Sequence, residues 1–158
     1  MATPKKALIF GIGNPGRGDD GLGPALIERF QARLRERAKG EDPVPAVECA
    51  FRYQLNIEDA YAIKDHDLVI FADAATTGDS AAGLTEVFPS DTIAFTTHRM
   101  SPACVLALCH EIFGQTPKAY ILSIRGHQWD VGEGLSARAE ENLEQAVTML
   151  LQFLATRA

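Results

Sequence analysis

The sequence predicts an α/β fold of three layers, in which helices cover both faces of a twisted, mostly parallel five-stranded sheet. Residues 7–12 and 68–72 are short apolar runs that end at Gly or Asp, as strands buried on both faces do. Amphipathic helical segments alternate with such strands along the chain. Hydrophobic residues make up 46% of the composition, which is enough for a sizeable core. We expect one domain over residues 1–158, similar in class to phosphorylase/hydrolase-like folds.

The first half of the chain predicts three strands and two helices. A Gly-rich loop at residues 11–23 follows the first strand. Apolar residues then recur every fourth position and predict an amphipathic helix: Leu22, Leu26, Phe30 and Leu34. Alternating apolar residues predict the second strand: Val47, Cys49 and Phe51. Residues 55–63 predict a short helix, and the third strand ends at Asp73.

The second half predicts two strands and two helices. The link at residues 74–83 is too short for a crossover helix, so the strand at 84–88 should run antiparallel to its predecessor. Ser101 and Pro102 predict a capped helix start, and Gly114 predicts the end of that helix after Phe113. Residues 120–124 predict the last strand. A helical stripe of apolar residues predicts a final helix: Leu143, Ala146, Val147, Leu150, Leu151 and Leu154.

Composition excludes several classes of protein. The net charge of −6 argues against a nucleic-acid partner, which would need a basic face. No apolar run approaches the roughly 18 residues of a membrane span, and the N-terminus does not read as a signal peptide. The three cysteines form no CxxC pair, so we expect a reducing compartment, the cytoplasm, rather than a disulfide framework or a zinc site. We expect a monomer.

Three polar groups should meet at one edge of the sheet, because ligands of such sheets bind beyond the carboxyl ends of the strands. They are Asp20 in the Gly-rich loop, Asp73 after the third strand, and His98 before the capped helix. Each one has a simpler interpretation, as a cap, a turn or a hydrogen-bonded loop residue. Together, two carboxylates and one imidazole would suit a divalent transition ion with open coordination positions.

The Gly-rich loop matches GxGxxG over residues 11–16, but its chemistry argues against a dinucleotide site. Four more residues separate the glycines from the helix, and two of them are Asp19 and Asp20, which would repel phosphates. Glu48 is the only candidate ribose contact. One of the two aspartates should cap the helix, and the other should then project past the strand end.

The resemblance to a known family rests on four motifs. The segment from Gly11 to Pro24 (GIGNPGRGDDGLGP) resembles the N-terminal signature of [NiFe]-hydrogenase maturation endopeptidases. The residues FADAA at 71–75, THRMSP at 97–102 and GEGLS at 132–136 resemble later motifs of the same family, in order and over nearly the whole chain.

This resemblance implies a peptidase that removes a C-terminal peptide from the nickel-loaded precursor of a hydrogenase large subunit. It implies that Asp20, Asp73 and His98 are both the catalytic and the metal-contacting residues, in an aspartyl-type endopeptidase. The nickel would be supplied by the precursor, and no organic cofactor is implied. The second acid is Glu in some relatives and Asp in this chain. Either the metal polarises the scissile carbonyl or a water, or a carboxylate acts as general base.

Other interpretations stay open. The protein could be a non-catalytic, nickel-sensing binding module for the same precursor. Residues 13–16 also resemble the opening of peptidyl-tRNA hydrolases, but the histidine that follows there is missing. Further side chains have a functional and a simpler interpretation: Cys104 and Cys109 as core packing, His127 and Trp129 as surface loop or substrate contacts, and Arg17, Arg99 and Arg125 as surface charge or contacts to the precursor's tail.

Overall fold

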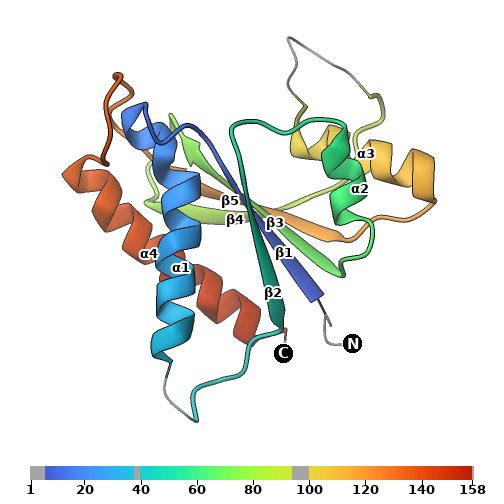
Figure 1. Ribbon diagram of the computed structural model, residues 1–158, viewed down its shortest axis with the longest axis horizontal. Helices are drawn as coiled ribbons and strands as arrows, with labels where there is room; N and C mark the ends of the chain where they lie inside the picture. The colour runs from blue at the N-terminus through green and yellow to red at the C-terminus, as the bar shows by residue number, and fades with distance from the viewer. Residues whose placement is uncertain (1–5, 38–39, 94–99, 158) are drawn as a thin grey trace.

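The structure, a computed structural model, describes residues 6–37, 40–93 and 100–157. Within these residues, five strands form one twisted sheet in the order β2-β1-β3-β5-β4 (Figure 1). The strands are β1 (Lys6–Ile12), β2 (Ala46–Arg52), β3 (Leu68–Ala75), β4 (Ala82–Val87) and β5 (Lys118–Arg125). Only β4 is antiparallel to its neighbour, which confirms the predicted fold class.

Helices cover both faces of the sheet. They are α1 (Leu22–Glu36), α2 (Glu58–Ile63), α3 (Pro102–Phe113) and α4 (Ala137–Ala155), and a 3₁₀ turn, η1 (Gly18–Gly21), precedes α1. Helices α1 and α4 pack on one face and α2 and α3 on the other, and each pair buries its own apolar cluster against the sheet (Figure 1). The layers place the carboxyl ends of β1, β3 and β5 at one edge, beside the loop that leads into α1.

Helix α3 begins and ends where the sequence predicts. The Ser101 side chain accepts a hydrogen bond from the N–H of Cys104 (3.1 Å), and Pro102 is the first helical residue. Gly114 ends the helix in the left-handed conformation, with φ of 76°. The stripe predicted for the last helix is confirmed as well, since Leu143, Val147 and Leu150 are fully buried in α4. Short-range signals of this kind decide local structure without help from distant residues.

Several element boundaries differ from the predictions. The strands predicted at 68–72 and 120–124 are longer and span Leu68–Ala75 and Lys118–Arg125. The helix predicted at 55–63 begins only at Glu58, because the Asn56 side chain accepts a hydrogen bond from the N–H of Glu58 and closes a turn there. The strand predicted at 84–88 spans Ala82–Val87. It runs antiparallel, as predicted, and pairs with β5 at the edge of the sheet.

The predicted alternation in β2 holds for only part of the strand. Val47 and Cys49 pack against the core on the α1 side, but Phe51 is 52% exposed. Beside Phe51 stand Pro24 and Ala25 of α1, and an open pocket separates them from the ring. The end of this edge strand is therefore apolar but not covered.

Candidate functional site

A cleft of about 570 Å³ opens at the carboxyl edge of the sheet. Its walls come from the ends of β1 and β3, residues 53–55 after β2, residues 100–102 at the start of α3, and Trp129 after β5. Asp20 and Asp73 both line it. This is where a mostly parallel sheet is expected to bind ligands.

Asp20 reaches the cleft from the turn η1. Its carboxylate is half-buried and accepts a hydrogen bond from the N–H of Asn14 (2.8 Å). Gly13 makes this approach possible, because its φ is 137° and a Cβ there would lie 1.9 Å from the backbone oxygen of Asp20. The N–H of Gly13 also donates to the carbonyl of Arg52 (2.9 Å), which ties the start of the loop to the end of β2.

Asp73 enters the same cleft from β3. It pairs in register with Ile12, the last residue of β1, so it stands level with the start of the Gly-rich loop. Its side chain is half-buried and accepts a hydrogen bond from the N–H of Ala74 (2.8 Å). The third predicted residue, His98, lies outside the described residues; the residues at 100–102 line the cleft.

Asp19, the neighbour of Asp20, is fully buried and is not among the residues that line the cleft. Four donors meet its two oxygens: the backbone N–H groups of His127 (2.7 Å), Gln128 (2.9 Å) and Ser136 (2.8 Å), and the Ser136 hydroxyl (2.7 Å). Burial alone raises the pKa of Asp19, but the hydrogen bonds from Ser136, His127 and Gln128 outweigh it. The pKa therefore lies below its ordinary value of 3.8. Asp19 is thus a charged connector between the Gly-rich loop and residues 127–136.

The prediction that one of these aspartates caps the helix is wrong. Neither η1 nor α1 receives a side-chain capping hydrogen bond, and Gly21 occupies the position before α1. The oxygens of Asp19 instead satisfy donors more than 100 positions later in the chain, among them Ser136, the residue that caps α4. A helix cap uses only donors from the next few residues. A fully buried carboxylate needs several donors, and residues 127–136 provide them.

The loop after β5 contributes Trp129 to the cleft. The indole packs on Gly126, where a Cβ would lie 2.8 Å from the ring and 2.9 Å from the Cβ of Asp19. It lines the cleft together with Asp20 and Tyr53. The simpler interpretation of Trp129 as a surface-loop residue is therefore incomplete. His127 faces elsewhere: its ring lies 3.4 Å from the Asn142 amide, and it does not line the cleft.

Two of the three arginines with open interpretations lie in the described part of the chain. Arg125 donates to the carbonyls of Gly78 (3.0 Å) and Gly126, so its guanidinium makes structural hydrogen bonds within the chain. Arg17 lines the outer part of the cleft beside Asp20. Arg99 lies outside the described residues.

The cysteines act as small apolar residues. Cys104 and Cys109 are buried in α3, which confirms the core-packing interpretation. Burial raises the pKa of the Cys109 thiol, and it raises the pKa of the Cys49 thiol to about 11. Such thiols are protonated at neutral pH and are poor nucleophiles.

Among residues 6–37, 40–93 and 100–157, no group of three or more His, Cys, Asp or Glu side chains is arranged to hold a metal ion. Asp20 and Asp73 supply two carboxylates to one cleft, which is an incomplete donor set for a transition ion without further groups. In the described part of the chain, no helix combines the length and apolar character needed to cross a bilayer.

Comparison with known proteins identifies the fold. No protein-family model matches the chain, and no curated protein is significantly similar to it in sequence. Solved structures are similar over almost the whole chain. The hydrogenase maturating endopeptidase HybD from E. coli matches with a TM-score of 0.70 and 19% identity, over 94% of this chain and 91% of that one.

Two archaeal structures are also similar. The [NiFe] hydrogenase maturation protease HycI from Thermococcus kodakarensis KOD1 matches with a TM-score of 0.64 and 24% identity, over 96% of this chain and 93% of that one. The hydrogenase 2 maturation peptidase from a Thaumarchaeota archaeon matches with a TM-score of 0.62 and 19% identity, over 95% of this chain and 98% of that one. From end to end, the described sheet and helices of this chain have the fold of the hydrogenase maturation proteases.

Proposed function

We propose that the protein is an endopeptidase that removes a C-terminal peptide from the nickel-loaded precursor of a [NiFe]-hydrogenase large subunit. The observation that carries the proposal is the convergence of Asp20 and Asp73 on one cleft in this fold. Solved structures with the same fold include proteins named as hydrogenase maturation endopeptidases and proteases. The motifs that resemble that family in sequence include both aspartates.

The geometry supports a cleft that engages a polypeptide. It is open along the carboxyl edge of the sheet, and Tyr53 and Trp129 line it beside Asp20. Aromatic side chains provide large contact areas at low conformational cost, which suits recognition of an extended chain. None of the three cysteines lines the cleft. Ser101, the serine that does line it among the described residues, caps α3 by accepting a hydrogen bond from the N–H of Cys104.

Nickel enters the proposal as part of the substrate. Asp20 and Asp73 would contact the ion that the precursor's own ligands already hold, and His98 would complete the set of protein contacts. Contact with the ion would place the scissile bond beside the carboxylates. Hydrolysis then follows by polarisation of the carbonyl or a water, or by general-base action of one carboxylate. We further propose that the protein works in the cytoplasm as a monomer.

The test is the intact mass of a cognate large-subunit precursor after incubation with the protein, with and without nickel loaded. The proposal predicts loss of a C-terminal peptide from the nickel-loaded form alone. Asp20→Asn and Asp73→Asn should both stop the loss. A stable complex whose precursor mass never changes would instead identify a nickel-sensing binding module, and cleavage by both variants would remove the two carboxylates from the reaction.

A further inference from the structure

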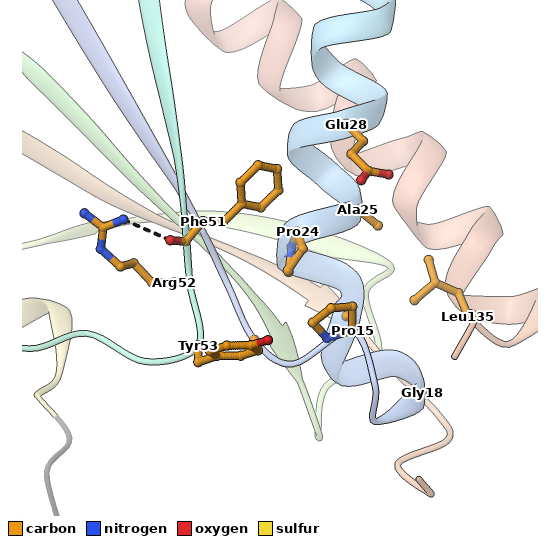
Figure 2. A pocket seen from close by; sticks show the side chains of 12 residues that line it. Pro15, Gly18, Pro24, Ala25, Glu28, Phe51, Arg52, Tyr53 and Leu135 are labelled. Carbon is orange, nitrogen blue, oxygen red and sulfur yellow. Dashed lines mark hydrogen bonds between the residues drawn. The ribbon is translucent and has the colours of Figure 1, made fainter. Parts of the chain in front are cut away.

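A second pocket, of about 440 Å³, lies on the far side of the Gly-rich loop from Asp73. It runs over the first turns of α1, between the end of β2 and the segment before α4. Figure 2 shows Phe51 and Tyr53 on one side of these turns and Leu135 on the other. Pro15 and Pro24 lie between them (Figure 2). The lining is predominantly apolar, which is typical of pockets that bind ligands through apolar groups.

The walls of this pocket are held in place by hydrogen bonds. The N–H of Gly18 donates to the carbonyl of Gly132 (2.9 Å), and the N–H of Gly132 donates to the carbonyl of Gly16 (2.9 Å). The bond from Gly13 to Arg52 fixes the opposite wall. The Arg52 side chain extends away from α1 (Figure 2) and pairs with the buried Asp59 at 2.8 Å. The pocket is thus formed before any partner arrives, which lowers the cost of binding.

Two large aromatic side chains in this pocket are exposed. Phe51 is 52% exposed and Tyr53 is 74% exposed. Phe51 lies near the end of β2, and Tyr53 follows directly after the strand, with Arg52 between them. In the described residues β2 pairs with β1 only and forms the edge of the sheet. Two exposed aromatic side chains at a sheet edge, beside a preformed pocket, are features of a surface that binds an extended peptide.

The pocket is continuous with the cleft of the proposed activity. Gly13 and Tyr53 line both of them. A polypeptide bound beside Asp20 can therefore continue across Tyr53 into the pocket. Because the pocket and the cleft are continuous, we expect the pocket to bind another segment of the same substrate.

The charge of the pocket specifies the occupant further. Glu28 of α1 lines the pocket with an exposed side chain, and Arg52, the only basic residue of the lining, is already paired with Asp59. The pocket therefore combines an apolar floor with a carboxylate at its edge that has no ion-pair partner among the described residues. A peptide with an apolar side chain beside a Lys or Arg would be complementary to it.

We propose that this pocket is a specificity subsite for the C-terminal extension of the precursor. An apolar side chain of the extension binds between Phe51 and Leu135, and a neighbouring basic residue pairs with Glu28. The proposal rests on the proposed function and adds the residues that select the substrate. The extension is the part of the precursor best able to lie extended in a surface pocket, because it is a chain end.

The test measures KM and kcat for cleavage of the nickel-loaded cognate precursor. Ala25→Trp fills the pocket and should raise KM about tenfold or more while kcat stays within about twofold. Glu28→Lys reverses the charge and should raise KM about threefold. Glu36→Lys makes the same charge change at the other end of α1, outside the pocket, and should leave both constants unchanged.

Unchanged KM values in folded Ala25→Trp and in Glu28→Lys overturn the subsite. If Ala25→Trp does not fold, Glu28→Lys tests the subsite with a charge-reversed substrate. A precursor whose extension carries Glu in place of its basic residue should be cleaved better by Glu28→Lys than by the wild type. Calorimetric binding of the precursor separates the two proposals. Weaker binding by the pocket variants without any cleavage by the wild type supports the subsite and overturns the peptidase, whereas a wild type that neither binds nor cleaves overturns both.

Discussion

Asp19 and Asp20 are neighbours in the chain, yet their side chains occupy opposite surroundings. Asp19 is fully buried and accepts hydrogen bonds from four donors. Asp20 is half-buried in the cleft, where the N–H of Asn14 donates to it. A carboxylate whose oxygens are saturated by the protein holds the fold together, whereas one with acceptor positions left over can bind a ligand. The two residues therefore separate stability from the proposed activity, and single substitutions can test that separation.

The largest expected effect is on activity. Asp20→Asn keeps an oxygen for the N–H of Asn14 but removes the negative charge from the cleft. We expect processing of a nickel-loaded precursor to slow by about 10³-fold, while the midpoint of thermal unfolding changes little. Intact mass over time and calorimetry measure the two quantities. Asp79→Asn, an exposed site between β3 and β4, is the matched control. Cleavage at the wild-type rate by the folded variant would contradict this assignment.

The next effect is on stability. Asp19→Asn replaces two acceptor oxygens by one and sets an amide group against backbone donors. We expect a loss of about 2–4 kcal/mol in the free energy of unfolding, because buried donors to a charged group lose their partner. Urea unfolding measures it. Asp130→Asn removes the same charge from an exposed position in the same loop and should change stability very little. If both variants lose the same free energy of unfolding, Asp19 does not connect the Gly-rich loop to residues 127–136.

A third substitution tests the packing of Trp129, which lines the cleft with Asp20, against Gly126 beside Asp19. Gly126→Ala places a methyl group 2.8 Å from the Trp129 ring and 2.9 Å from the Cβ of Asp19. We expect a loss of about 1–3 kcal/mol, from overpacking, and a shift of the indole in the cleft. Trp129 is the only tryptophan of the chain, so its fluorescence spectrum reports that shift directly. Gly83→Ala is the control, since a Cβ there meets nothing within 4 Å. An unchanged spectrum in Gly126→Ala would show that the ring does not rest on this glycine.

The smallest effect concerns pH. The pKa of Asp19 is lower in the folded protein than its ordinary value of 3.8, because the hydrogen bonds from Ser136, His127 and Gln128 outweigh the effect of burial. The unfolded chain therefore takes up a proton first as the pH falls, and the stability contributed by Asp19 is present above about pH 4 and lost through the acid range. Unfolding free energies of the wild type and Asp19→Asn from pH 7 to pH 3 should converge below about pH 4. A constant difference over this whole range would rule out the shift.

The sequence was informative wherever the signal was local. Ser101, Pro102 and Gly114 set the ends of α3 by contacts within a few residues, and apolar runs identified β1 and β3. Asp73 was predicted at the carboxyl edge because it directly follows the apolar run of its strand. The convergence of Asp20 and Asp73 on one cleft needed only the rule for parallel sheets. The third proposed contact, His98, stays a prediction.

The rest depends on contacts between distant segments. The partners of Asp19 lie 108 to 117 positions away, and no periodicity marks them in the sequence. The place of Trp129 depends on how residues 126–136 fold against the Gly-rich loop. Phe51 is exposed because α1 presents Pro24 and Ala25 opposite it, and the alternation within β2 carries no information on that neighbour.

The connection made by Asp19 has a consequence for synthesis of the protein. The ribosome makes the Gly-rich loop long before residues 127, 128 and 136, so Asp19 has none of these partners until they have emerged. Synthesis of the intervening chain takes many seconds at ordinary translation rates of about 5–20 residues per second. During that time the carboxylate of Asp19 stays hydrated and the loop is not fixed to the later segment. A nascent chain of this protein therefore cannot present the finished cleft until the segment before α4 has been made.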